Sequence, residues 1–112
     1  MRITISGRKM EVTDALREHI ETGLAKVRTH FDKIIDANVV LAVEKRRHIA
    51  EVTLLANGIR IHGKEESDDM YASVDAVVLK LDKQVRRFKF EHFINFHFLF
   101  LIEHPIFYAT AN

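Results

Sequence analysis

The sequence contains no cysteine and no long hydrophobic run. Without cysteine, neither a disulfide framework nor a cysteine-based zinc site can form, which fits a reducing cytosol. The longest apolar stretch, residues 93–102, includes Asn95 and His97, and it is far shorter than the roughly 20 residues of a membrane-spanning helix. Residues 1–10 lack the apolar segment of a secretory signal peptide. We therefore predict a cytoplasmic protein that has no membrane partner.

Residues that could carry catalysis are also scarce. The sequence has no glycine-rich phosphate loop, no GxSxG motif and no cysteine nucleophile. The histidines at 19, 30, 48 and 62 lack metal-binding spacings, and we interpret them as surface histidines. Asp68 and Asp69 could form a carboxylate pair for a metal or for acid–base work. At the start of a helix, capping explains them better. We therefore predict no enzymatic activity, no metal and no cofactor.

Charge is distributed unevenly along the chain. Residues 1–89 hold all 17 Lys and Arg and all but two of the 16 Asp and Glu. Residues 90–112 hold Glu91, Glu103 and six of the eight Phe. The composition changes sharply near residue 89, so we predict one folded domain over residues 1–89, followed by an atypical apolar tail over 90–112.

Two amphipathic helices are expected within that domain. Thr13 is a plausible N-cap for a helix over residues 14–31. Its apolar stripe recurs at spacings of three and four and comprises Leu16, Ile20, Leu24, Val27 and Phe31. A second, longer helix is expected to be capped by Ser67 or Asp68. Its stripe comprises Met70, Val74, Val77, Val78, Leu81, Val85 and Phe88.

The remaining segments read as strands. Alternating or β-branched apolar residues predict them over residues 2–6, 37–45, 49–56 and 59–64. Residues 46–48 form a polar turn, and Asn57-Gly58 is a strong hairpin signal. The order β-α-β-β-β-α predicts an α+β fold, a four-stranded mixed sheet with both helices packed on one face. The first two strands could pair in parallel, and Arg60 and His62 should lie on the uncovered face.

Cations are segregated on the second helix. Lys80, Lys83 and Arg87 fall on one flank of its apolar stripe, and most of its acids fall on the other side. A solvated helix face would explain such charges, and cations near a helix C-terminus favour its dipole. Segregation by sign favours an anionic partner instead. The candidate residues for binding such an anionic partner, RNA being one, are Lys26, Arg28, Lys80, Lys83, Arg86, Arg87 and Lys89.

Several segments resemble the ribosome hibernation promoting factor family, which includes the ribosome-associated inhibitor protein Y. The segments that carry the resemblance are VTDALREHI (12–20), LAKV (24–27), VVLAVEK (39–45), IHG (61–63), DMYASVD (69–75) and LKLDKQ (79–84). The match covers residues 2–89 and implies the short type of family member. It implies a fold similar to that of double-stranded-RNA-binding domains. It also implies that Lys26, Lys80, Lys83 and Arg87 match basic positions that meet ribosomal RNA.

The same resemblance implies a function. Members of the family bind 16S ribosomal RNA of the small subunit in the decoding channel, block messenger and transfer RNA, and promote ribosome hibernation under stress and in stationary phase. We therefore expect a translation inhibitor whose partner is the ribosome. Two other readings stay open, namely a general double-stranded-RNA-binding module and an interaction protein that acts through the apolar tail.

The tail departs from the family's pattern. Short members end in a few Lys-rich polar residues, and long members add a second domain, but residues 90–112 are neither. One explanation is a frameshift or readthrough product, because the tail is rich in residues with T- or A-rich codons. The other is a genuine apolar tail that folds back on the sheet or weakly pairs subunits. The alternation of Phe96, Phe98, Phe100 and Ile102 makes a strand one option for this segment.

Overall fold

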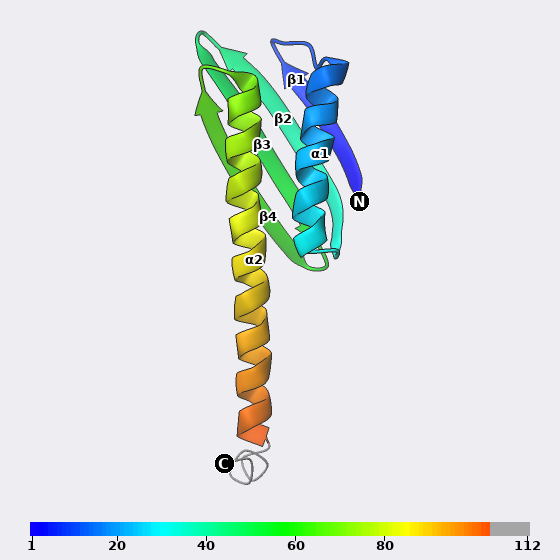
Figure 1. The fold of residues 1–112 in the computed structure, drawn as a ribbon, viewed down its shortest axis with the longest axis vertical. Coiled ribbons are helices and arrows are strands. Elements are labelled where there is room, and N and C mark those ends of the chain that lie inside the picture. Colours follow the sequence, from blue (N-terminus) through cyan, green and yellow to red (C-terminus); the bar gives the residue numbers. More distant parts are fainter. Residues whose placement is uncertain (104–112) are drawn as a thin grey trace.

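The fold is a single sheet covered by two helices. A computed structural model describes residues 1–103, with side chains described to Glu91. Its elements are β1 (Arg2–Arg8), α1 (Asp14–His30), β2 (Ile34–Glu44), β3 (Arg47–Ala56), β4 (Ile59–Ser67) and α2 (Met70–Glu103). The four strands are ordered β1-β2-β3-β4, and both helices lie on the same face of the sheet (Figure 1). The predicted α+β architecture is confirmed.

Pairing within the sheet is mixed, as expected. β1 pairs with β2 in parallel, with Arg2 opposite Asp36 and Ile5 opposite Val39. β3 pairs antiparallel with both β2 and β4. Two parallel strands need a crossover connection. The segment that contains α1 connects β1 to β2 and packs on one face of the sheet. Arg60 and His62 are exposed on the uncovered face, as predicted.

One predicted turn is confirmed and the other is wrong by a residue. Gly58 has a φ of 72° between β3 and β4, so the Asn57-Gly58 hairpin forms as expected. The polar turn expected over residues 46–48 instead lies at Lys45-Arg46, because Glu44 already pairs with Arg47 across β2 and β3. Lys45 takes the left-handed conformation, with a φ of 58°, that lets two residues reverse the chain.

The two helix starts were predicted with unequal success. The Oγ1 of Thr13 accepts a hydrogen bond from the backbone N–H of Leu16 at 3.2 Å, so the first cap is confirmed. The second cap is neither Ser67 nor Asp68. The Oδ2 of Asp69 accepts from the N–H of Ala72 at 3.2 Å. Ser67 ends β4 and binds the Ser73 hydroxyl at 2.7 Å instead, which leaves Asp69 as the residue directly before the helix.

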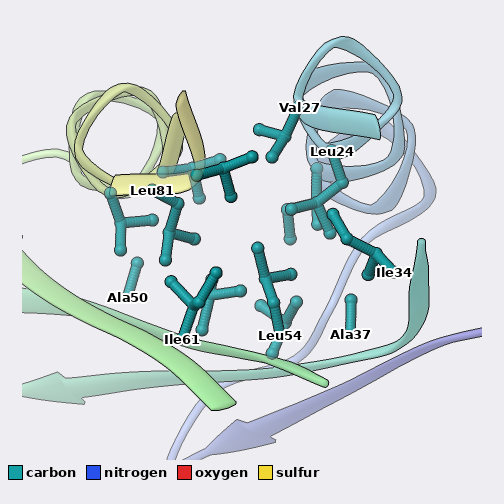
Figure 2. Close-up of a cluster of buried hydrophobic side chains, with 14 of the residues drawn as sticks. Leu24, Val27, Ile34, Ala37, Ala50, Leu54, Ile61 and Leu81 are labelled. Atoms are coloured by element: carbon teal, nitrogen blue, oxygen red, sulfur yellow. The ribbon is translucent and has the colours of Figure 1, made fainter. Parts of the chain in front are cut away.

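The hydrophobic core lies between the sheet and the two helices. Figure 2 shows Leu24 and Val27 of α1 and Leu81 of α2 pointing toward Leu54 and Ile61 of the sheet. Both predicted helical stripes are buried at most of their positions. Gly63 of β4 allows α2 to approach the sheet closely. A Cβ at that position would lie 3.2 Å from the side chains of both Val77 and Leu81.

The C-terminal part of α2 corrects the expectation of a strand. The alternation at 96–102 made a strand one option, but the backbone is helical to Glu103. This part of α2 extends beyond the end of the sheet (Figure 1). A helix that continues past the sheet forms its backbone hydrogen bonds within itself, whereas a strand needs a partner strand. The boundary at residue 89 falls inside this continuous helix and stays a prediction, as does the origin of the tail. Residues 104–112 lie outside the described residues.

Removal of the tail should leave the fold intact. A chain that ends at Lys89 retains every residue of the described core, of which Phe88 is the last. We expect the truncated protein to be monomeric and its melting temperature to fall by less than about 5 °C, the shift caused by about 1 kcal/mol in a domain of this size. Thermal melts and size-exclusion chromatography of both chains would check this. Unfolding of the shorter chain would show that the tail is a structural element.

Candidate RNA-binding surface

The acidic flank of α2 faces α1, and we call the contact between the two helices the seam. The Nε2 of His19 lies 2.6 Å from Oδ1 of Asp75, and the Nδ1 of His30 lies 2.6 Å from Oδ1 of Asp82. Between these pairs, Gly23 of α1 lets Val78 approach closely. The acids of α2 that the sequence placed opposite the cations are therefore turned toward α1. This leaves the basic flank to face outward.

The outer α2 row, which we define as Lys80, Lys83 and Arg87, lies above the edge strand β4. Lys80 Nζ is 3.5 Å from the Oε1 of Glu65, and Arg87 Nε is 3.2 Å from the Oε1 of Glu91. Gln84, on the same side of the helix, donates to the carbonyl of His62 on β4 at 3.3 Å. Lys83 is exposed and makes no ion pair with any residue whose side chain is described. The structure thus brings these three predicted residues together.

Three other candidates gather around the helix seam. Lys26 follows Gly23 by three residues and precedes His30 by four, so it lies on the side of α1 that meets α2. Arg86 is 3.0 Å from Asp82, and Lys89 Nζ donates to the carbonyl of His30 at 3.3 Å. We call Lys26, Arg86 and Lys89 the seam group. Lys89 has a structural contact in addition, because it satisfies a carbonyl at the end of α1.

Arg28 is the candidate that the structure separates from the others. It lies on the far side of α1, where it borders a depression with Met1, Ile3 and Glu21 beside β1. The two helix surfaces therefore carry three groups of cations and not one cluster. Any single partner that touches all of them has to cover most of the helical layer.

Ion pairs made by these cations are exposed and hence weak. Arg87 and Glu91 in their pair have side chains 82% and 60% exposed, and Lys80 and Glu65 are 49% and 37% exposed. Exposed pairs of this kind contribute about 0–1 kcal/mol. A phosphate group could replace such a carboxylate at little cost, because charge-assisted bonds to phosphate are at least as strong. The intramolecular pairs therefore do not exclude an anionic partner.

Ion pairs join neighbouring strands on the uncovered face of the sheet. Arg47 binds Glu66 at 2.7 Å, His62 lies 3.0 Å from Glu51, and Arg2 binds Asp36. The hydrogen bond and the attraction from Glu66 raise the pKa of Arg47 above its ordinary value. Two arginines and one histidine of this face are therefore paired with carboxylates of neighbouring strands.

The sequence reasoning missed several contacts. His19 and His30 are partly exposed, as predicted, but the sequence did not show that both bridge the two helices. Their common side of α1, opposite the acids of α2, was the available signal. Among the side chains that are described, no three His, Asp or Glu lie close enough to hold a metal ion. No helix within the described residues is long and apolar enough to cross a membrane.

The structure is that of a small α+β domain with exposed cations on its helical layer. The chain belongs to the family described as sigma 54 modulation protein / S30EA ribosomal protein, whose family model matches residues 3–91. It is 44% identical over 89 residues to the ribosome hibernation promoting factor of Salmonella typhimurium, covering 80% of this chain and 94% of that protein. Identity to the Escherichia coli K12 protein of the same name is 42%, with the same coverage. The resemblance found in the sequence is confirmed.

Solved structures agree with this assignment. A ribosomal subunit interface protein from Coxiella burnetii superposes with a TM-score of 0.76 at 30% identity, covering 80% of this chain and 98% of the other. The N-terminal domain of Thermus thermophilus protein Y gives a TM-score of 0.74 at 36% identity, covering 79% and 99%. The family consists of non-enzymatic binding proteins, so membership confirms the prediction that this protein is not an enzyme.

Proposed function

We propose that this protein binds the small ribosomal subunit through its helical layer and blocks messenger and transfer RNA in the decoding channel. Its relatives' names support a ribosome-associated role in hibernation. Lys and Arg on α1 and α2 would neutralise phosphates of 16S ribosomal RNA, and the fit of the domain to the channel would give specificity. Such a factor works in the cytoplasm, where ribosomes are.

The observation that carries the proposal is the opposite orientation of the two flanks of α2. Asp75 and Asp82 face α1 and are paired with its histidines. Lys80, Lys83 and Arg87 face away from α1, and at least Lys83 has no carboxylate partner among the described side chains. Two acids of α2 are thus occupied at the seam, while three of its cations are turned outward. This arrangement favours a polyanion approaching from the helix side.

A competition experiment tests the decoding-channel site. We expect labelled protein bound to purified small subunits to be displaced by a short messenger RNA together with its cognate transfer RNA, because all three would occupy the same space. Sedimentation of the labelled protein with the subunits measures the displacement. Large subunits, which lack the channel, are the matched control and should not retain the protein.

Two results would contradict the proposal. Simultaneous binding of the protein and the messenger–transfer RNA pair would place it outside the channel. Equally tight binding to a naked RNA duplex would instead favour a general double-stranded-RNA-binding module, because it would show that the shape of the ribosomal site contributes nothing.

A further inference from the structure

A pocket of about 490 Å³ opens where α1 ends beside the turn between β3 and β4. Figure 1 shows these two segments at the same end of the sheet, next to α2. The volume lies within the range of about 300–1,000 Å³ that is common for small-ligand sites. Of the residues that line the pocket, Lys89 is the one that also belongs to the seam group. The position places the pocket directly beside the proposed RNA-binding surface.

Two aromatic rings line the pocket, and we call them its aromatic floor. Phe31, at the end of α1, is 8% exposed, and Phe88 of α2 packs against it. Their ring centroids are 5.9 Å apart and the rings are tilted by 38°. Two rings from different elements therefore lie together in the lining of a pocket that is open to solvent. Such a surface suits a flat, apolar group that can pack on an aromatic side chain.

The rim is polar and carries both signs of charge. Lys33 and Asn57 are exposed at its edge, and the ammonium group of Lys89 is held by the carbonyl of His30 at 3.3 Å. Asp32 also borders the pocket. An amide and a carboxylate can hydrogen-bond the polar edge of a nucleobase, and two ammonium groups attract phosphate. An aromatic floor with this rim has the complementarity that a nucleotide requires.

We propose that the pocket binds one unstacked base of ribosomal RNA, with the adjoining phosphate held near Lys33 and Lys89. The inference rests on the proposed function and adds to it a site for a single nucleotide. Bases inside an RNA duplex are stacked on their neighbours and cannot enter a pocket, so the ligand has to be an unpaired nucleotide. Unpaired bases that stack on aromatic side chains are a common mode of RNA recognition.

Replacing Phe88 by Leu tests the aromatic floor. The Phe88→Leu variant keeps an apolar side chain, but it removes the ring on which a base would stack. We expect ribosome affinity to fall at least about fivefold, the lower end of what base stacking contributes. Phe90→Leu is the matched control, because Phe90 is 65% exposed and lies about 200° around the helix from Phe88. Lys33→Ala, an exposed change, tests the rim if Phe88→Leu impairs folding.

A measurement without ribosomes separates this inference from the proposed function. Nucleoside 5′-monophosphates should shift the NMR signals of Phe31, Asn57 and Phe88 in a saturable way, and ribose 5-phosphate should not. Equal shifts with ribose 5-phosphate, or no shift with any nucleotide, would overturn the inference. If the wild type binds ribosomes and both Phe88→Leu and Lys33→Ala bind equally well, the pocket has no role there. If the wild type does not bind ribosomes, the proposed function fails and the NMR titration decides about the pocket.

Discussion

Replacing Lys80, Lys83 and Arg87 together by Ala is expected to weaken ribosome binding about a hundredfold near physiological salt. Each phosphate contact changes the slope of log affinity against log salt by about 0.7–0.9. When the salt concentration falls from about 1 M to about 0.15 M, a slope of this size raises the affinity roughly fivefold for each phosphate contact. The three contacts multiply because they lie on separate phosphates. Ribosome co-sedimentation over a salt series should also show the slope flattened by about 2–3.

The triple variant should remain folded, since its three side chains are exposed and the ion pairs lost with Glu65 and Glu91 are weak. Thermal melts would confirm this. A matched control replaces Arg8, Arg60 and Lys64, three exposed cations on the uncovered face of the sheet. It removes the same charge, so a similar loss of affinity in the control would show that net charge and not location determines binding. An unchanged salt slope in the outer-row variant would refute the assignment of this flank.

Replacing Leu81 by Ala is expected to have the largest effect on stability. Leu81 is 0% exposed and packs against Gly63 at the centre of the contact between α2 and the sheet. Removing a buried leucine side chain costs about 3–5 kcal/mol in the free energy of unfolding, since a cavity remains. That is a large part of the total stability of a small domain, which is about 5–15 kcal/mol. Urea denaturation of the two proteins would measure the loss.

Leu79→Ala is the control on the same helix. Leu79 is 55% exposed, so its replacement should change the free energy of unfolding by no more than about 0.5 kcal/mol. A loss below about 1 kcal/mol for Leu81→Ala would mean that the site collapses around the smaller side chain. Close packing against Gly63 would then not be what holds α2 on the sheet.

The elements could be predicted from the sequence because their signals are local. Apolar residues at spacings of three and four define α1 and the first part of α2, and Asn57-Gly58 defines one hairpin. The N-cap of α2 was ambiguous because neighbouring residues have similar side chains. Ser67, Asp68 and Asp69 are all good N-cap residues, and the end of β4 decides which of them is used. The start of β2 at Ile34 was missed because its pairing with Ala56 is set by the sheet.

The geometry of the candidate surface could be predicted only in part. Helical geometry alone places Lys80, Lys83 and Arg87 on one flank, which the structure confirms. Contacts between elements depend on how the two helices pack, and a helical wheel of one helix carries no information about that packing. The contact of Lys89 with His30 joins residues 59 positions apart. The pocket likewise combines Phe31, Asn57 and Phe88 from three separate segments. No local pattern brings such residues together.

The parallel pairing of β1 with β2 has a consequence for the order in which the sheet folds. Arg2 meets Asp36 across 34 residues, whereas two-residue turns join β2 to β3 and β3 to β4. Closing the longer loop costs more chain entropy before any pairing stabilises it, so contacts between distant residues form slowly. The meander of β2, β3 and β4 with α2 can therefore assemble first, and β1 joins last at an edge. Fraying of β1 would leave the outer α2 row on an intact scaffold.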